Sequence, residues 1–201
     1  MIVIGFGGEP ATGKSRIMKA VMNELNEKPI VTNLKMDKHT IKLTLFIDNN
    51  VTVIGHYLPG EKFGGTDRLS MSIQPKMEIY LKNEIDKGSE TTILFEGDRL
   101  FNKKFISYIK GLYHVQSFFF IVDCREHIKH ERHAARDNQD ESWLRGRATK
   151  VNNVRNEFDL VAVYNNIESD IPNIVDFILK ARNNMLAKQA QDIMLLKEIG
   201  Y

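Results

Sequence analysis

The chain has 201 residues, of which 42% are hydrophobic and 27% charged, a balance that excludes a disordered chain. A net charge of +2 argues neither for nor against a polyanionic partner, and a single cysteine, Cys124, excludes an internal disulfide and suits the reducing cytoplasm. No apolar run approaches the ~18 residues of a membrane span, so we expect no membrane partner. We therefore expect a single domain over residues 1–201, with neither a signal peptide nor an upstream domain.

The first predicted elements are a buried strand over residues 1–6 and a helix that begins at Ser15. Between them, residues 8–15 read GEPATGKS and match the phosphate-binding pattern G-x-x-x-x-G-K-[ST]. Glycines let the backbone N–H groups surround a polyphosphate, and the helix N-terminus adds positive potential. Lys14 is then expected on the terminal phosphates and the Ser15 hydroxyl on magnesium. The expected nucleotide-binding residues here are Gly8, Ala11, Thr12, Gly13, Lys14, Ser15 and Arg16.

Strands and helices then alternate along the chain. Further strands are expected at 29–32, 41–47, 51–57, 91–96, 117–123 and 160–165. Helices are expected at 70–87 and 103–112, in a polar segment at 126–156, and as one or two closing helices within 171–199. Residues 41–47 and 51–57 flank Asp48-Asn49-Asn50 and are typical of a hairpin. The pattern predicts an α/β fold with a doubly wound, mainly parallel sheet and an inserted hairpin.

A glycine-rich loop precedes the helix expected at 70–87 and carries a polar triplet. Gly64 and Gly65 would allow a substrate to approach the backbone, and Thr66 and Arg68 are candidates to bind it. Asp67 is a candidate base for an acceptor hydroxyl. The alternative is that Thr66 or Asp67 caps the next helix.

The strand expected at 91–96 ends in Glu96-Gly97-Asp98-Arg99. Ligands of such folds bind at the carboxyl ends of the strands, where a carboxylate is needed to position magnesium or to accept a proton. We expect Asp98 or Glu96 to hold magnesium with Ser15, and Asp98 is also a candidate base. Arg99 is expected to bind the acceptor. A solvated loop charge pair is the alternative.

The polar segment 126–156 is rich in arginine and is expected to form a lid. Arg132 and Arg136 are four residues apart, on one helix face, and are expected to stabilise charge on the transferred group. Arg145 and Arg147 are candidate substrate ligands. A solvated mixed-charge helix would explain the same pattern.

Two further segments carry candidate roles. Asn165 follows the last strand, where it would contact the adenine edge, although turns also favour Asn. Residues 118–120 are all Phe and are expected in the core. In the closing helix, apolar residues at helical spacing predict packing on the sheet, with a partner surface as the alternative.

The loop at 8–15, the Asp98-Arg99 pair and the arginine-rich segment before the last strand resemble the P-loop nucleoside and nucleotide kinase superfamily along most of the chain. Residues 63–70 resemble the corresponding loop of bacteriophage kinases of the 5-hydroxymethyluracil DNA kinase type. The resemblance implies ATP and Mg²⁺ as cofactors, the host cytoplasm as the location, and phosphorylation of the hydroxymethyl group of a modified base in DNA.

Two other functions stay open. The Asp98-Arg99 pair is also similar to thymidylate kinase, which implies a deoxynucleoside monophosphate as the acceptor. A nucleotide-binding regulatory protein that hydrolyses ATP slowly is the third hypothesis. The chain has no N-K-x-D motif, which disfavours a regulatory GTPase, and no adjacent Asp-Glu after the strand at 91–96, which disfavours a motor ATPase. The oligomeric state is left open.

Overall fold

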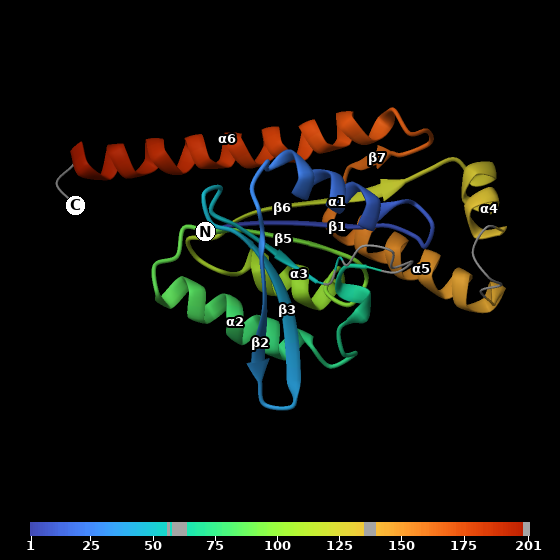
Figure 1. The fold of residues 1–201 in the computed structure, drawn as a ribbon, viewed down its shortest axis with the longest axis horizontal. Helices are drawn as coiled ribbons and strands as arrows, with labels where there is room; N and C mark the ends of the chain where they lie inside the picture. The colour runs from blue at the N-terminus through green and yellow to red at the C-terminus, as the bar shows by residue number, and fades with distance from the viewer. Residues whose placement is uncertain (56, 58–63, 135–139, 199–201) are drawn as a thin grey trace.

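A computed structural model describes residues 1–55, 57, 64–134 and 140–198, with only the backbone described for residue 67 and residues 193–198. Helices cover both faces of a seven-stranded sheet (Figure 1). The strands are β1 (Ile2–Gly7), β2 (Ile30–Met36), β3 (His39–Phe46), β4 (Val51–Ile54), β5 (Thr92–Glu96), β6 (Gln116–Asp123) and β7 (Ala162–Tyr164). The helices are α1 (Lys14–Glu24), the 3₁₀ turn η1 (Thr66–Arg68), α2 (Gln74–Asp86), α3 (Lys103–Lys110), α4 (Glu126–Ala134), α5 (Glu141–Phe158) and α6 (Asp170–Glu198).

The strand order is β2-β3-β4-β5-β1-β6-β7. The five strands from β4 to β7 in this order run parallel, and β2 and β3 are antiparallel additions at one edge. This arrangement confirms the predicted α/β fold with a mainly parallel sheet and an inserted hairpin. Because β1 lies between β5 and β6, the loop after β1 lies beside the carboxyl ends of both neighbours.

The edge of the sheet holds one hairpin more than the sequence predicts. The strand expected at 29–32 extends to Met36 and pairs with β3 along its whole length, down to the pair Met36–His39. Asp37 turns the chain between them with a φ of 52°, a left-handed conformation that Asp tolerates better than most residues. The short polar turn at Asp37 therefore marks a second hairpin.

Two cores lie on opposite faces of the sheet. Helices α1 and α6 cover one face, and α2, α3 and α5 cover the other (Figure 1). Phe119 and Phe120 are buried, as expected, and Phe120 stacks on Phe6 with ring centroids 5.1 Å apart. Phe177 of α6 packs edge-on against Phe118 and Phe120. The apolar stripe of the closing helix therefore packs on the sheet.

Segment 126–156 contributes two helices: α4 lies at the end of the sheet where the parallel strands terminate, and α5 packs Val151 and Val154 against one face (Figure 1). Asp140 caps α5 by accepting a hydrogen bond from the backbone N–H of Ser142 at 2.9 Å. The closing helices are one helix, α6, within the described residues. None of the described helices combines the length and apolar composition needed to cross a bilayer.

Candidate active site

The loop between β1 and α1 has a backbone that only particular residues can adopt. Gly8 and Gly13 have φ values of 149° and 91°, and Ala11 has a φ of 66°. A Cβ on Gly8 would lie 2.1 Å from the Val122 carbonyl oxygen. Both glycines are therefore required by conformation, which agrees with their fixed places in the phosphate-binding pattern.

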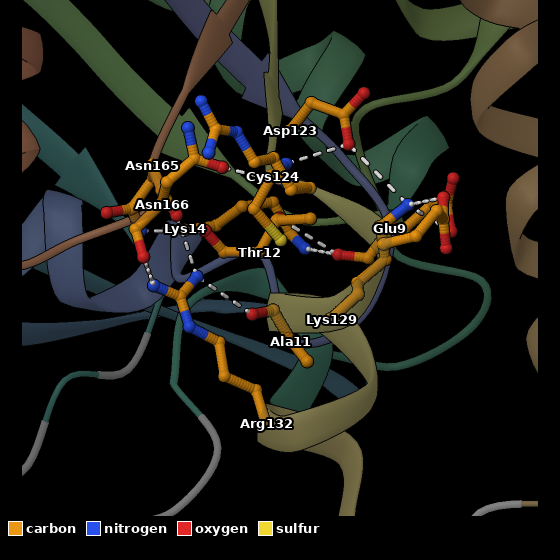
Figure 2. Close-up of polar contacts among 12 residues, drawn as sticks. Glu9, Ala11, Thr12, Lys14, Asp123, Cys124, Lys129, Arg132, Asn165 and Asn166 are labelled. Carbon is orange, nitrogen blue, oxygen red and sulfur yellow. Dashed lines mark hydrogen bonds and ion pairs between the residues drawn. The ribbon is translucent and has the colours of Figure 1, made fainter.

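Donors from within and outside the loop hold its carbonyl oxygens (Figure 2). The Glu9 carbonyl accepts hydrogen bonds from Lys14 Nζ at 2.7 Å and from Thr12 Oγ1 at 3.0 Å. The Thr12 carbonyl accepts one from Asn165 Nδ2 at 2.9 Å. Because these carbonyl oxygens already accept hydrogen bonds, they do not turn toward a bound anion. The N–H groups of the loop can then face the phosphates.

Glu96 provides the carboxylate next to the loop. Its side chain is buried, and Oε1 accepts hydrogen bonds from the Ser15 hydroxyl at 2.8 Å and from the Tyr57 hydroxyl at 3.3 Å. Gly65 packs against it, because a Cβ there would lie 2.0 Å from Glu96 Oε1. The last residue of β5 and the first turn of α1 thus meet at one point.

The hydroxyl of Ser15 and the carboxylate of Glu96 fit a magnesium ion. Mg²⁺ prefers oxygen ligands and is commonly held by one or two protein groups together with substrate phosphates and water. The two oxygens already lie within hydrogen-bond distance of one another, at the base of the loop that would hold the phosphates. Of the two acids expected for this role, Glu96 is the one placed beside Ser15.

The polar triplet after Gly65 has a different placement for each residue. Thr66 is buried, and its hydroxyl donates a hydrogen bond to the Glu96 carbonyl at 2.7 Å, which ties the loop to the end of β5. Arg68 is exposed. The side chain of Asp67 lies outside the described part of the chain. Neither α2 nor η1 has a side-chain hydrogen bond at its N-cap.

Asp98 faces α5 and not the phosphate-binding loop. Its carboxylate pairs with Arg147, and Lys150 Nζ donates a hydrogen bond to its backbone carbonyl at 2.9 Å. Arg147 also lies over the Trp143 ring, 4.9 Å from the centroid. Arg145 is exposed and pairs with Glu141 one turn away on the same helix. The structure therefore places Arg147, but not Arg145, at the end of β5.

Arg99 adds a second guanidinium at this end of the strand. It is half-buried, its NH1 contacts the Met71 sulfur, and its Nε has no hydrogen-bond partner among the described residues. A thioether is a weak acceptor for a cation. This arginine is thus suited to bind an anion that arrives with a substrate.

Arg132 and Asn165 lie behind the phosphate-binding loop (Figure 2). Arg132 NH1 donates to the Asn165 carbonyl at 2.9 Å and approaches the Ala11 carbonyl at 3.5 Å. The Asn165 side chain is only 2% exposed, and its Nδ2 would lie 2.3 Å from a Cβ on Gly13. Both side chains therefore stabilise the conformation of the loop.

The other predicted basic residues of this region have peripheral or undescribed positions. Arg136 lies outside the described residues. Arg16 is exposed and pairs with Glu168 at 2.5 Å, which links α1 to the turn before α6. That pair lies at the surface, where ion pairs contribute little to stability.

One group at the site has no counterpart in the sequence-based prediction. Lys129 of α4 is buried, and its ammonium lies between the carboxylates of Glu9, Asp123 and Glu126. Burial acts to lower the pKa of Lys129, but the hydrogen bond to Glu126 and the charges of Glu9 and Asp123 outweigh it and raise the pKa overall. A lysine in a polar helix carries no sequence signal for burial, so only the fold reveals this cluster.

These features define the class of protein: an α/β nucleotide-binding protein with a phosphate-binding loop and an acidic residue at the end of the neighbouring strand. Within that class the chain belongs to the P-loop Nucleotide Kinase3 family, whose model matches residues 2–172. Membership identifies the protein as a kinase-type enzyme that uses a nucleotide. No curated protein matches the chain.

Two solved structures have a low similarity to this chain. A sugar kinase from Janibacter sp. HTCC2649, in its unliganded form, has 12% sequence identity and a TM-score of 0.48, over 90% of this chain and 93% of that one. An uncharacterized protein from Eubacterium ventriosum ATCC 27560 has 11% identity and a TM-score of 0.45, over 90% of this chain and 98% of that one.

Proposed function

We propose that the protein transfers the γ-phosphoryl group of ATP to an acceptor hydroxyl or phosphate. The observation that supports this most directly is the hydrogen bond from Ser15 to the buried carboxylate of Glu96 beside the phosphate-binding loop. It joins the two groups that a magnesium nucleotide needs in one place. The loop alone would fit any P-loop protein, whereas the family membership favours a kinase.

In this proposal the loop amides and Lys14 bind the β- and γ-phosphates. To reach them, the Lys14 ammonium leaves the Glu9 carbonyl, to which it donates a hydrogen bond in the present structure. Ser15 and Glu96 hold magnesium, which would neutralise charge on the phosphates. Asn165 and Arg132 act indirectly, by fixing the loop carbonyls.

The acceptor side is formed by the end of β5 and by α5. We assign Asp98 as the base for an acceptor hydroxyl and Arg99 and Arg147 as the groups that bind the acceptor. Asp98 pairs with Arg147, and Lys150 Nζ lies 3.9 Å from the same carboxylate oxygen, so two cations of α5 face this group. Asp67 and Arg136 remain candidates for the base and for closure over the transferred group.

For the acceptor we propose the hydroxymethyl group of 5-hydroxymethyluracil in DNA. The support is the resemblance of residues 63–70 to the loop of bacteriophage kinases. A base inside a duplex would have to turn out of the stack to reach Asp98, at a cost of a few kcal/mol. Lys103, Lys104 and Lys110 of α3 are candidate phosphate contacts for such a substrate.

A deoxynucleoside monophosphate is the alternative acceptor. The half-buried Arg99, whose Nε is unpartnered among the described residues, favours a substrate that carries its own phosphate. Such a phosphate is present in a free nucleotide and also in a DNA strand. The two acceptors are therefore distinguished by comparing phosphoryl transfer to DNA with transfer to a free monophosphate.

The test is transfer of radiolabelled γ-phosphate from ATP with Mg²⁺ to three acceptors in parallel. These are DNA that contains 5-hydroxymethyluracil, unmodified DNA, and a mixture of deoxynucleoside monophosphates. Label in the modified DNA alone supports the DNA-base acceptor, and label in a monophosphate replaces it with the alternative. Acceptor-independent hydrolysis only would overturn the kinase proposal in favour of a regulatory nucleotide-binding protein.

Lys14→Ala is the matched loss-of-function variant for that assay. We expect it to abolish transfer without loss of the fold, because Lys14 is only half-buried at the start of α1, donates to the loop carbonyl of Glu9 and lies outside the two apolar cores. Lys180→Ala is the control, since Lys180 is an exposed lysine paired with Asp176 on α6. Wild-type activity in the Lys14 variant would contradict the site assignment.

A further inference from the structure

The phosphate-binding loop carries a negative charge of its own. Glu9 is the second residue of the loop, and its side chain is 25% exposed. Its backbone carbonyl is the acceptor for Lys14 Nζ at 2.7 Å, so the Glu9 residue lies next to the ammonium that is expected to bind phosphates. A carboxylate on a loop that binds a polyphosphate would repel it, and the repulsion is stronger where water is partly excluded.

A cation from another element lies against this carboxylate. Lys129 Nζ is 3.2 Å from Glu9 Oε2, 3.6 Å from Asp123 Oδ1 and 2.9 Å from Glu126 Oε1 (Figure 2). The Lys129 side chain is 6% exposed, whereas Glu126 is 77% exposed and therefore well screened by water. The close and shielded partners of Lys129 are thus Glu9 of the loop and Asp123 at the end of β6.

Lys129 and Arg132 both reach the phosphate-binding loop from one helix, α4. Arg132 lies one turn further along the same helix and reaches the carbonyls of Ala11 and Asn165. Two cations from one helix face therefore contact the first half of the loop, one at a side chain and one at the backbone. Burying an ammonium costs free energy that its paired carboxylates offset, so removing one partner leaves an uncompensated charge at the loop.

We propose that Lys129 is a positioning residue for nucleotide binding, whose ammonium neutralises Glu9 within the phosphate-binding loop so that a triphosphate does not meet an uncompensated carboxylate. This inference rests on the proposed nucleotide site but not on the identity of the acceptor. It predicts opposite effects for the two partners. Loss of the Lys129 charge weakens ATP binding, whereas loss of the Glu9 charge does not, because a carboxylate that only repels phosphate is dispensable for binding.

The experiment is a titration of the chain with a fluorescent ATP analogue and Mg²⁺, which measures Kd without requiring transfer. The variants are Lys129→Met, Glu9→Gln, the double variant and Lys129→Arg, with circular dichroism melts to compare folding. Lys82→Met is the control, because Lys82 pairs with Asp86 on the exposed face of α2. We expect Lys129→Met to raise Kd about tenfold and Glu9→Gln to lower it about threefold, because the gain or loss of one nearby charge changes the affinity for a polyanion by factors of this size. The double variant should return to within about threefold of wild type, and Lys129→Arg should retain most of the affinity.

A purely structural role for the pair would give a different pattern. In that case Glu9→Gln weakens binding, and adding it to Lys129→Met gives no recovery; either result overturns the proposal. If Lys129→Met does not fold, the direction of the Glu9→Gln effect and the affinity of the double variant still decide. A wild-type chain that does not bind the analogue overturns this proposal and the proposed function together, whereas binding without transfer overturns only the kinase.

Discussion

Glu96 and Asp98 are separated by one glycine at the end of β5, yet their side chains have different surroundings. Glu96 is buried and accepts a hydrogen bond from Ser15, while Asp98 pairs with Arg147. Successive side chains of a strand alternate between its faces, but beyond the strand end the backbone at Gly97, with a φ of 97°, directs the chain away. The structure thus separates two acids that the sequence presents as equivalent.

At the residue scale this separation predicts different magnesium dependences. We expect Glu96→Gln to lower kcat by ~10²-fold or more and to raise the Mg²⁺ concentration for half-maximal activity by ~10-fold or more. Asp98→Asn should lower kcat by a similar factor without a change in that Mg²⁺ concentration, because it removes the base and not a ligand. Initial rates across a Mg²⁺ series distinguish the two, and equal Mg²⁺ shifts would contradict the assignment.

Arg132 and Asn165 are residues whose contacts could not be predicted from the local sequence. The sequence places both near the nucleotide, and in the structure both lie beside the phosphate-binding loop. The sequence predicts contacts with the transferred group and with adenine. In the structure Arg132 donates to the Asn165 carbonyl and lies 3.5 Å from the Ala11 carbonyl, and Asn165 donates to the Thr12 carbonyl. Which side of a loop a long polar side chain reaches depends on the packing of α4 and β7, and no local pattern encodes that packing.

At the scale of elements, α5 is attached to the end of β5 through charged side chains. Arg147 pairs with Asp98, and Lys150 Nζ donates to the Asp98 carbonyl at 2.9 Å. On the buried side, Val151 and Val154 pack α5 into the core. The helix expected as part of a lid is therefore held along one side, and its charged face lies at the end of β5, where we propose that the acceptor binds.

This attachment predicts a selective effect for Arg147→Met. Loss of a charge-assisted contact typically costs about 1.5–3 kcal/mol, so kcat/KM for the acceptor should fall about 10- to 100-fold. The KM for ATP should stay within about twofold, because the contacts of Arg147 within the described part of the chain are with Asp98 and Trp143 and not with residues 8–15. Initial rates with each substrate varied in turn measure both. A change in the KM for ATP alone would contradict the assignment of Arg147 to acceptor binding.

At the scale of the whole molecule, two helical layers pack on the sheet through separate apolar cores, one of which includes the strand before the phosphate-binding loop and helix α6. Phe120 lies at the centre of one core, fully buried, with Phe6 and Phe177 as neighbours. These three rings come from β6, β1 and α6. They join the strand that leads into the phosphate-binding loop to the closing helix, so this core supports the position of the loop.

We expect Phe120→Ala to lower the free energy of unfolding by about 3–5 kcal/mol, the usual range for a large aromatic removed from a packed core. Tyr113→Ala is the matched control, since Tyr113 is 82% exposed and its loss should change stability by less than about 0.5 kcal/mol. Urea denaturation followed by circular dichroism measures both. If the free energy of unfolding falls as little as in the control, the neighbouring side chains must move to fill the space that Phe120 leaves.

The sequence by itself determined the phosphate-binding loop, the mainly parallel sheet and the acidic end of β5. Each depends on local chemistry: glycines at left-handed positions, apolar runs with strand length, and polar residues where a buried strand stops. The tertiary structure alone decided that Glu96 rather than Asp98 meets Ser15, that Arg132 and Asn165 brace the loop, and that Lys129 is buried among carboxylates. These contacts join residues more than 30 positions apart, and their geometry follows from how helices and strands pack.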